Sequence, residues 1–547
     1  MRYLSVYPLV ALFVLLAVIT DAKPLFAKRY KKTTKEDQKF WREKAQAELE
    51  KTLKVKLNEN VAKNVILFLG DGMSIPTLTA SRIYKGQLQK MGGEEGFLSF
   101  ENFPHVGLSK TYDVDKQVAD SASTATAYLT GVKTNYKTIG VDATAIYQDC
   151  SSITEDNKVY SIVKWAQDAG KRTGVVTSTR VTHATPAGTY AHVTDRDWEC
   201  DGAISAENQK KCPKLKDIAR QLVEDEPGAS INVVMGGGYQ NFDANATGTP
   251  DDPIDTQYGN CSRRDNKNLI DTWKAKKTEA KVKYQFVRNK TDLDKVDFIN
   301  TQFLLGIFAN GHVPYEYEKK SKNLDVPTLA QMTEAAIKIL RQEPKGYFLL
   351  VEGGRIDHAH HDGIAHRALD ETVAMDEAVE KALNLTNEED TLIVVTADHA
   401  HTMSISGYPL RGQEITGLAA EGDDGLPYTT LMYANGPGYN YSVDGSHVEH
   451  PLLSNQSVST WNYKQLAAIP LDSETHGGDD VAIYALGPMA HLFHTLHEQN
   501  YIAHAMAYAA CIGDNTKHCT DGANSMIPSA SLSVFLLPLL SALWFHY

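Results

Sequence analysis

The sequence predicts an α/β fold with a doubly wound, mainly parallel central sheet and helices on both of its faces. Short β-branched or aliphatic runs lead into polar or glycine-rich turns, and they lie at Val65–Leu69, Thr173–Thr177, Ile231–Met235, Tyr347–Val351, Leu392–Thr396 and Val481–Leu486. Runs this short that are apolar on both faces suit buried parallel strands. Longer helical patterns lie between them, notably Leu329–Arg341, Ala365–Leu383 and Leu492–Ala510. Strands that alternate with helices favour a doubly wound sheet.

The start of the chain is predicted to be a targeting segment followed by a helical arm. A basic residue, the apolar run Leu4–Ile19 and a small-residue exit predict a signal peptide over residues 1–22. The alternative, a membrane-anchoring helix, normally needs a longer run. Lys28-Arg29 leaves a second cleavage open. Residues 23–62 form the predicted N-terminal helical arm, because Lys35–Leu57 is charged and free of proline; this arm lies on the surface or on a partner subunit.

The body of the chain is predicted to be one catalytic α/β domain with an insertion. The domain spans residues 63–406 and 473–519. Residues 407–472 are rich in Gly, Pro, Asn, Ser and Tyr, which indicates an inserted, exposed subdomain.

The C-terminal pattern is typical of a glycosylphosphatidylinositol (GPI) signal, predicted over residues 522–547. Small residues at Asp521–Ser525 precede a polar spacer and the apolar tail Leu532–Phe545, which no charged flank follows. Attachment is expected at Gly522 or Asp521. The alternative of a tail-anchored span conflicts with the N-terminal signal.

Composition agrees with a secreted globular protein. Of 547 residues, 42% are hydrophobic and 22% charged, so a sizeable core is expected. The net charge of −13 argues against specific nucleic-acid binding. Glycosylation sequons stand at Asn245, Asn260, Asn289, Asn384, Asn440 and Asn455. Six cysteines in an oxidising compartment predict disulfides, and because no C-x-x-C occurs, cysteine-bound zinc is not expected.

One short stretch, Val351–Asp362, concentrates metal-binding side chains. Asp357 and His361 stand four residues apart, so on a helical turn they share a face and can hold one zinc. Glu352, a hard oxygen donor, suits magnesium. His360 is assigned to the helix surface and left out of the site. Taken alone, such a cluster is more typical of a solvated loop than of a metal site.

Similar clusters follow other predicted strands, at the edge where ligands bind in such sheets. Asp71 lies in LGDGM, and Ser121 follows Asp120 at the start of an alanine-rich helix. That Asp-Ser pair suits either an ordinary helix cap or a serine nucleophile whose phosphoryl group meets backbone N–H groups. Further along the chain come His183, Thr185, Arg196, Asp398, His399, His401 and His476. Together these residues predict a multi-metal hydrolase that uses serine.

Six motifs in order, LGDGM, DSASTATAYLTG, HATPAG, VEGGRIDHAHH, TADHAH and ETHGGDDV, resemble alkaline phosphatases of the animal, GPI-anchored type. The resemblance runs from about Lys63 to about Cys519. It implies broad hydrolysis of phosphate monoesters through a phosphoserine, with an alkaline phosphatase-like fold and a crown-like insertion. It also implies a homodimer held by a GPI anchor on the extracellular face of the plasma membrane.

The resemblance further implies two Zn²⁺ and one Mg²⁺ per subunit, with defined ligands. Asp357, His361 and His476 would hold one zinc, and Asp71, Asp398 and His399 the other, next to Ser121. Asp71, Thr185 and Glu352 would hold magnesium, and Arg196 would bind the phosphoryl oxygens. His183, His358 and His401 would orient and tune these ligands.

Disulfides, calcium and departures from the family pattern complete the expectations. The family implies Cys150–Cys212 and Cys511–Cys519; the remaining Cys200 and Cys261, expected in exposed segments, should pair.

Calcium binding is expected to be weak or absent, because Ala309 stands where relatives carry a glutamate beside Phe308, ahead of Asp325, and Asn310 is a poor substitute. Ser74 and Ser123 replace usual glycines, and each adds a hydroxyl near the site that would retune phosphate release.

Two other functions are weighed against this one. Phosphodiesterases and sulfatases share such metal sheets, but a diesterase more often uses threonine and a sulfatase needs a C/S-x-P-x-R context, which is absent around Ser121. A catalytically dead surface receptor is the alternative from another class, and measuring metal content and monoester turnover separates it from an enzyme.

Overall fold

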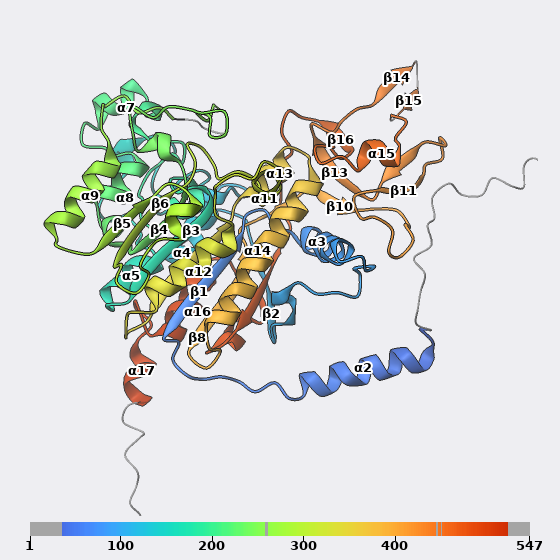
Figure 1. Ribbon diagram of the computed structural model, residues 1–547, viewed down its shortest axis with the longest axis horizontal. Coiled ribbons are helices and arrows are strands. Elements are labelled where there is room, and N and C mark those ends of the chain that lie inside the picture. The colour runs from blue at the N-terminus through green and yellow to red at the C-terminus, as the bar shows by residue number, and fades with distance from the viewer. Residues whose placement is uncertain (1–35, 257–260, 445–446, 450, 523–547) are drawn as a thin grey trace, which may run out of the picture.

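A computed structural model describes residues 36–256, 261–444, 447–449 and 451–522. Its main feature is a ten-stranded sheet in the order β19-β2-β18-β8-β1-β7-β3-β4-β6-β5 (Figure 1). The strands are β1 Asn64–Gly70, β2 His105–Lys110, β3 Arg172–Arg180, β4 Val233–Gly237, β5 Tyr284–Val287, β6 Phe303–Ile307, β7 Tyr347–Gly353, β8 Thr391–Ala397, β18 Val481–Leu486 and β19 Thr495–Glu498. The predicted doubly wound, mainly parallel sheet is therefore confirmed.

The central strands are apolar on both faces because each face has its own core. In β1, Val65, Leu67 and Leu69 belong to one hydrophobic cluster, whereas Ile66 and Phe68 belong to the other. This alternation is the period of two that a strand imposes on its side chains.

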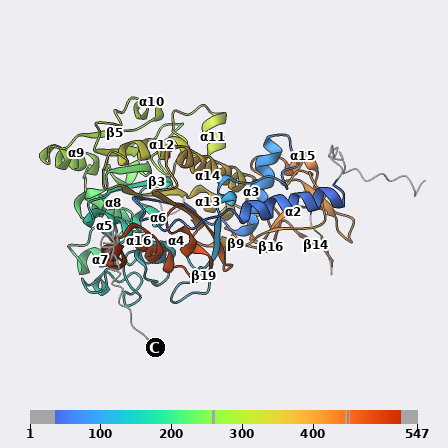
Figure 2. The same ribbon diagram turned by 90° about the horizontal axis from the view of Figure 1, so that it is seen from below.

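Helices cover both faces, and Figure 2 shows them on opposite sides of the sheet. One layer contains α3 Ile75–Leu88, α12 Leu329–Leu340 and α14 Ala365–Leu385. The other contains α4 Ser121–Thr130, α5 Ile162–Asp168, α8 Ile218–Glu224, α9 Leu269–Glu279 and α16 Tyr501–Ala510. Shorter helices are α6 Ala184–Ala187, α7 Ala206–Lys211, α10 Lys290–Leu293, α11 Glu316–Ser321, α13 Arg355–His361, α15 Asn455–Val458 and α17 Lys517–Gly522.

Small sheets occupy the region of the predicted insertion. A three-stranded sheet contains β10 Met403–Ile405, β13 Leu431–Gly436 and β16 Ala467–Pro470. Two hairpins add β11 Leu418–Glu421 with β12 Pro427–Thr429, and β14 Ser442–Asp444 with β15 His447–Glu449. Figure 1 shows these elements to one side of the central sheet, beyond α3.

Two expectations about the C-terminal part are wrong. Leu492–Ala510 is not one helix, because Thr495 takes a positive φ angle of 72° and the chain forms β19 before α16 begins at Tyr501. β18 is not parallel: it runs antiparallel to both of its neighbours, β8 and β2.

The N-terminal helix α2, Gln38–Thr52, lies at the margin of the molecule (Figure 1). Asp37 caps it by accepting hydrogen bonds from the backbone N–H groups of Lys39 and Phe40. None of its residues is buried, and Trp41 and Leu49 are 48% and 51% exposed.

Three disulfides join Cys150 to Cys212, Cys200 to Cys261 and Cys511 to Cys519. Cys200 and Cys261 are only 0% and 3% exposed, so the expectation that they lie in exposed segments is wrong. Their neighbourhood is closed by the buried ion pair between Arg263 and Asp217.

Candidate active site

Four acidic or serine side chains meet where neighbouring strands end. Leu69 of β1 is in register with Glu352 of β7, and Gly70 with Ala397 of β8. The next residues along β1 and β8 are Asp71 and Asp398, so all three carboxylates reach one edge of the sheet. The N-terminus of α4 brings Ser121 to the same place, within 3.3 Å of Asp71 Oδ1.

Asp357, His361 and His476 form the first ligand cluster. Asp357 Oδ1 lies 3.3 Å from His361 Nε2 and 3.4 Å from His476 Nε2, and the two nitrogens are 3.1 Å apart. Ligands of a tetrahedral zinc with bonds of about 2.0–2.1 Å are separated by roughly 3.3 Å. The spacing of these three atoms therefore matches a zinc site.

Asp71, Asp398 and His399 form the second cluster, around Ser121. His399 Nε2 is 3.4 Å from Asp71 Oδ1 and 3.2 Å from Asp398 Oδ2. Ser121 Oγ is 3.2 Å from the same nitrogen, and the serine is 2% exposed. The hydroxyl thus completes a set of four atoms with zinc-like spacing.

Glu352, Thr185 and Asp71 define a third, oxygen-rich cluster. Thr177 and Thr179, at the end of β3, donate hydrogen bonds to Glu352 Oε2. Glu352 Oε1 and Asp71 Oδ2 are buried without a hydrogen-bond partner among the described residues. Buried carboxylate oxygens left unpaired are costly, and a hard cation such as magnesium satisfies them.

The electrostatics of the site also require cations. Burial raises the pKa of Asp71 well above its usual value, and Asp398, Asp357 and Glu352 raise it further. Burial likewise raises the pKa of Glu352 to about 7. Such crowded acids are stable as carboxylates only with positive charge between them.

Arg196 provides positive charge on the other side of Ser121. Its Nη1 donates to Asp120 Oδ2 at 2.9 Å, and its Nη2 lies 3.1 Å from His183 Nε2. Burial, followed by the Arg196 charge, lowers the pKa of His183 well below its usual value. A neutral His183 that accepts from Arg196 at Nε2 has its proton on Nδ1, and Nδ1 is buried without a hydrogen-bond partner among the described residues.

The other two supporting histidines lie where they can hold ligands. His401 Nε2 is 2.8 Å from Asp357 Oδ1. His358 lies behind the site, where its Nδ1 is 3.0 Å from Arg355 Nη1 and its ring packs 5.4 Å from that of His183. The catalytic, metal-ligating and supporting residues expected from the sequence thus lie together at this edge of the sheet, and their roles stay predictions.

Sequence reasoning missed two residues of this region. Glu474, 1% exposed, binds His401 Nδ1 and accepts a hydrogen bond from Thr402 N. His312 packs against His183 and His358 with ring separations of 5.3 and 4.3 Å. Glu474 stands inside the quoted motif ETHGGDDV and could have been found there; His312 lies in no motif.

The assignment of His360 to the helix surface is wrong. His360 is 0% exposed, and its ring nitrogens contact Thr77 Oγ1 at 3.0 Å and Tyr433 OH at 2.7 Å. It joins α13 to α3 and to the insertion, because α13 is packed between them.

Gly72 shows how tightly the site is built. It has a φ of +68°, and a Cβ there would lie 2.4 Å from the His401 ring. The glycine of LGDGM is therefore required both by its backbone conformation and by the close approach of that ring.

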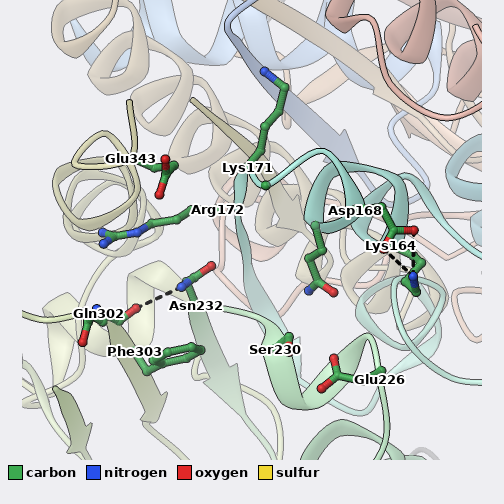
Figure 3. Close-up of a pocket in the computed structure, with 12 residues that line it drawn as sticks. Lys164, Asp168, Lys171, Arg172, Glu226, Ser230, Asn232, Gln302, Phe303 and Glu343 are labelled. Carbon is green, nitrogen blue, oxygen red and sulfur yellow. Dashed lines mark hydrogen bonds and ion pairs between the residues drawn. The ribbon is translucent and has the colours of Figure 1, made fainter. Parts of the chain in front are cut away.

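A separate pocket, drawn in Figure 3, lies at the amino ends of β3, β4 and β6, on the opposite edge of the sheet. Its cations already have partners: Lys171 donates to two backbone carbonyls, Arg172 to Ile339 O, and Lys164 to Asp168. The catalytic chemistry therefore belongs to the carboxyl edge.

Comparison with known proteins agrees with this geometry. A family model described as alkaline phosphatase matches residues 62–512. The alkaline phosphatase of Gadus morhua is 50% identical over 480 residues, which cover 87% of this chain and 98% of that protein. The membrane-bound alkaline phosphatase of Bombyx mori is 42% identical over 506 residues, covering 91% and 89%. The structure of alkaline phosphatase from the Antarctic bacterium TAB5, at 20% identity, covers 83% of this chain and 99% of that one with a TM-score of 0.55, so the fold is shared. The chain belongs to the alkaline phosphatase family of metal-dependent enzymes, and it is a hydrolase of phosphate monoesters.

Proposed function

We propose that Ser121 is the nucleophile of this hydrolysis and that the reaction passes through a phosphoserine. The observation that supports this most directly is the position of Ser121 Oγ, 3.2–3.3 Å from His399 Nε2 and Asp71 Oδ1 at the start of α4. At the start of a helix the dipole favours a negatively charged phosphoryl group. The backbone N–H groups of Ala122 and Ser123 themselves donate to the Asp120 carboxylate.

The clusters described above fit two zinc ions and one magnesium ion. Asp357, His361 and His476 would hold one zinc; Asp71, Asp398 and His399 the other; Asp71, Thr185 and Glu352 magnesium. When bound, these ions would supply the positive charge that favours the Ser121 alkoxide and the leaving oxygen.

The protein's own groups carry out the remaining steps. Ser121 Oγ forms a bond to phosphorus in line as the bond to the alcohol oxygen breaks. Water then attacks phosphorus from the side that the alcohol left, opposite Ser121 Oγ, as the bond to the serine breaks. Two inversions retain configuration at phosphorus. Arg196 binds two phosphoryl oxygens, and because contacts are made to phosphate alone, many alcohols are accepted.

Trapping the intermediate tests this route. Acid quenching with radiolabelled phosphate should label Ser121, and Ser121→Ala should abolish labelling and lower turnover by on the order of 10³-fold or more while zinc content stays normal. Ser109→Ala, which removes another buried serine hydroxyl, is the control. Near-normal turnover in Ser121→Ala excludes the phosphoserine route.

We propose further that the enzyme is GPI-anchored at the extracellular face of the plasma membrane. Support comes from the two terminal sequence patterns and from the membrane-bound relative of Bombyx mori. Within residues 36–522, where described, no helix is long and apolar enough to cross a membrane. The attachment residues Asp521 and Gly522 close α17, whereas the tail lies outside the described residues. Release by a phosphatidylinositol-specific phospholipase supports the anchor; recovery of Leu532–Phe545 from the mature protein refutes it.

A homodimer and asparagine-linked glycan positions follow as smaller proposals. The exposed apolar side chains of α2 support the proposal that it packs on a partner subunit, and deleting residues 36–52 should shift the mass in solution from dimer to monomer. Four sequon residues are exposed, Asn245, Asn384, Asn440 and Asn455; Asn289 is half-buried, and Asn260 lies outside the described residues.

We also propose that calcium is not a tightly bound cofactor. Asp325 Oδ1 accepts a hydrogen bond from Thr291 N, and Ala309 offers no side-chain oxygen. The neighbouring carboxylate of Asp252, which accepts a hydrogen bond from Asn310 N, lies 3.3 Å from the Arg288 guanidinium. An arginine therefore already neutralises the charge that this carboxylate could offer to calcium. Saturation of a calcium site at micromolar free ion would overturn this.

A further inference from the structure

The Ser123 hydroxyl lies between two buried carboxylates that compete for its single proton. Ser123 Oγ is 3.1 Å from Asp113 Oδ2 and 2.9 Å from Asp120 Oδ1, and it is also 3.0 Å from the Asp120 carbonyl. Asp113 is 4%, Asp120 2% and Ser123 1% exposed. A hydroxyl can donate one hydrogen bond at a time, so both carboxylates cannot be satisfied by it when both are charged.

Asp120 connects this hydroxyl to the phosphate-binding arginine. Its Oδ2 accepts from Arg196 Nη1 at 2.9 Å, while its Oδ1 accepts from Lys137 N at 2.8 Å and from Ser123. Burial would raise the pKa of Asp120, but Arg196 and these donors outweigh it and lower the pKa. The strength of the interaction between Asp120 and Arg196 therefore depends on how many other groups donate hydrogen bonds to the Asp120 carboxylate.

We propose that Ser123 and Asp113 are positioning residues that control how firmly the phosphate-binding Arg196 is held. This deepens the proposed role of Arg196 and rests on it. When Asp113 is protonated, it donates to Ser123 Oγ and Ser123 donates to Asp120, so every group is satisfied. When Asp113 is ionised, it takes the Ser123 proton, and Asp120 keeps only backbone donors beside Arg196. Asp120 then binds the guanidinium more strongly and competes better with phosphate.

The charge state of Asp113 changes in the working range of such an enzyme. Burial raises the pKa of Asp113 to about 7, against the opposing hydrogen bonds from Lys116 N and Ser123, and with support from Asp115 and Asp120. Phosphate affinity should therefore fall as Asp113 loses its proton above pH 7.

Other charges surround this group and are accounted for. On its own segment, Lys116 N donates to Asp113 Oδ1 at 2.6 Å, and the Asp115 carboxylate accepts from Tyr136 N. From the end of α4, Lys133 contacts Tyr112 O and pairs with Glu498, which also pairs with Lys110. Asp480 lines the same surface pocket as Asp113. Among these, only Asp113 shares the Ser123 hydroxyl with Asp120.

The inhibition constant of inorganic phosphate, measured on the metal-loaded enzyme between pH 6 and 9, tests the proposal. Asp113→Asn mimics the protonated acid, because its amide still donates to Ser123. At pH 9 it should bind phosphate about 3- to 10-fold more tightly than the parent, and at pH 6 about equally. Taking ratios at each pH cancels the titration of phosphate itself.

Two further variants make the result specific. Asp115→Asn removes a neighbouring charge that has no contact with Ser123. Because Asp115 helps raise the pKa of Asp113, this variant should shift the change in phosphate affinity to lower pH, and its ratio to the parent should be close to one at pH 9, where Asp113 is ionised in both proteins. In a Ser123→Ala background, Asp113→Asn should lose its effect, since the bridge is gone. If Asp113→Asn folds poorly, Ser123→Ala carries the test alone: its phosphate inhibition should lack the component that appears above pH 7 in the parent.

Failure of this proposal is distinct from failure of the arginine's role. A ratio for Asp113→Asn that is constant across pH, or one that persists in Ser123→Ala, overturns the positioning role. If Arg196→Ala leaves the phosphate inhibition constant unchanged, the assignment of Arg196 itself is wrong.

Discussion

Two sets of buried carboxylates in this protein are neutralised in different ways. Asp217 is paired by Arg263, whose Nη1 and Nη2 donate to its two oxygens at 3.2 and 3.0 Å. Asp71 and Glu352, at the carboxyl edge of the sheet, each leave one oxygen without a hydrogen-bond partner in the described chain. Asp217, whose role is structural, is neutralised by the guanidinium of an arginine of the same chain. The unpaired oxygens of Asp71 and Glu352 are suited instead to binding a metal cation.

A third buried carboxylate, that of Glu371, is neutralised by protonation. Burial, reinforced by Glu316, raises the pKa of Glu371 to about 8. Glu371 lies on α14, where it accepts a hydrogen bond from Glu316 N at 2.6 Å. Metal binding, ion pairing and protonation therefore predict three different responses when the carboxylate is substituted.

Removing a carboxylate at the catalytic edge should have the largest effect. Asp71→Asn should lower turnover by on the order of 10³-fold or more, because this residue contributes to two metal clusters. Metal analysis should show loss of zinc and magnesium together, with the fold retained. Full metal content in this variant would contradict the assignment of Asp71 as the bridging ligand.

Removing the structural carboxylate should instead destabilise the fold. Asp217→Asn leaves Arg263 with Asp265 and the more distant Asp201 as carboxylate partners and should cost about 3 kcal/mol of unfolding free energy. Denaturant unfolding measures this, and activity per folded molecule should match the parent. Loss of zinc from the folded variant would show that the two sets of carboxylates are not separate.

Glu474 tests the support of the first zinc cluster. Glu474→Gln removes the carboxylate that fixes His401 against Asp357, so zinc affinity should fall about 10- to 100-fold. Chelator competition measures it, with Asp472→Asn, an exposed change on the same segment, as the control. Equal affinities in the two variants would show that His401 needs no such partner.

The smallest effect is expected at Glu371. Because its pKa is raised in the folded state, its contribution to stability is complete below the unfolded value and is lost as pH rises through about 8. Glu371→Gln should therefore gain about 2–4 °C in melting temperature over the parent at pH 9 and little at pH 5. The exposed Glu380→Gln on the same helix is the control, and an equal gain at both pH values would contradict the protonated state.

The sequence predicted the parts of the fold whose pattern is local. β1, β7 and β8 are apolar on both faces and bounded by turns, and α12 and α14 follow long periodic patterns. The edge strand β5 is short and mixed in polarity, and strand order depends on contacts between distant segments. The helix expected over Leu492–Ala510 is interrupted at Thr495 by a positive φ angle that threonine does not favour.

The site divides in the same way. Ligands such as Asp357 and His399 could be predicted because they lie in short sequence motifs with other metal-binding residue types. His312 and His360 could not, because their partners lie on other elements: His360 contacts Tyr433, which is 73 residues away in the chain. Likewise, the competition between Asp113 and Asp120 for Ser123 appears only in three dimensions.

The central claim is that the two ligand clusters at the carboxyl edge of the sheet bind zinc. The most direct test is to collect diffraction from crystals of the metal-loaded protein on both sides of the zinc absorption edge. We predict two anomalous zinc peaks, one among Asp357, His361 and His476 and the other among Asp71, Asp398 and His399 beside Ser121. Density without a zinc signal should lie between Glu352 and Thr185, as expected for magnesium. Absence of zinc from either cluster at full activity would contradict the claim that these residues bind the catalytic metals.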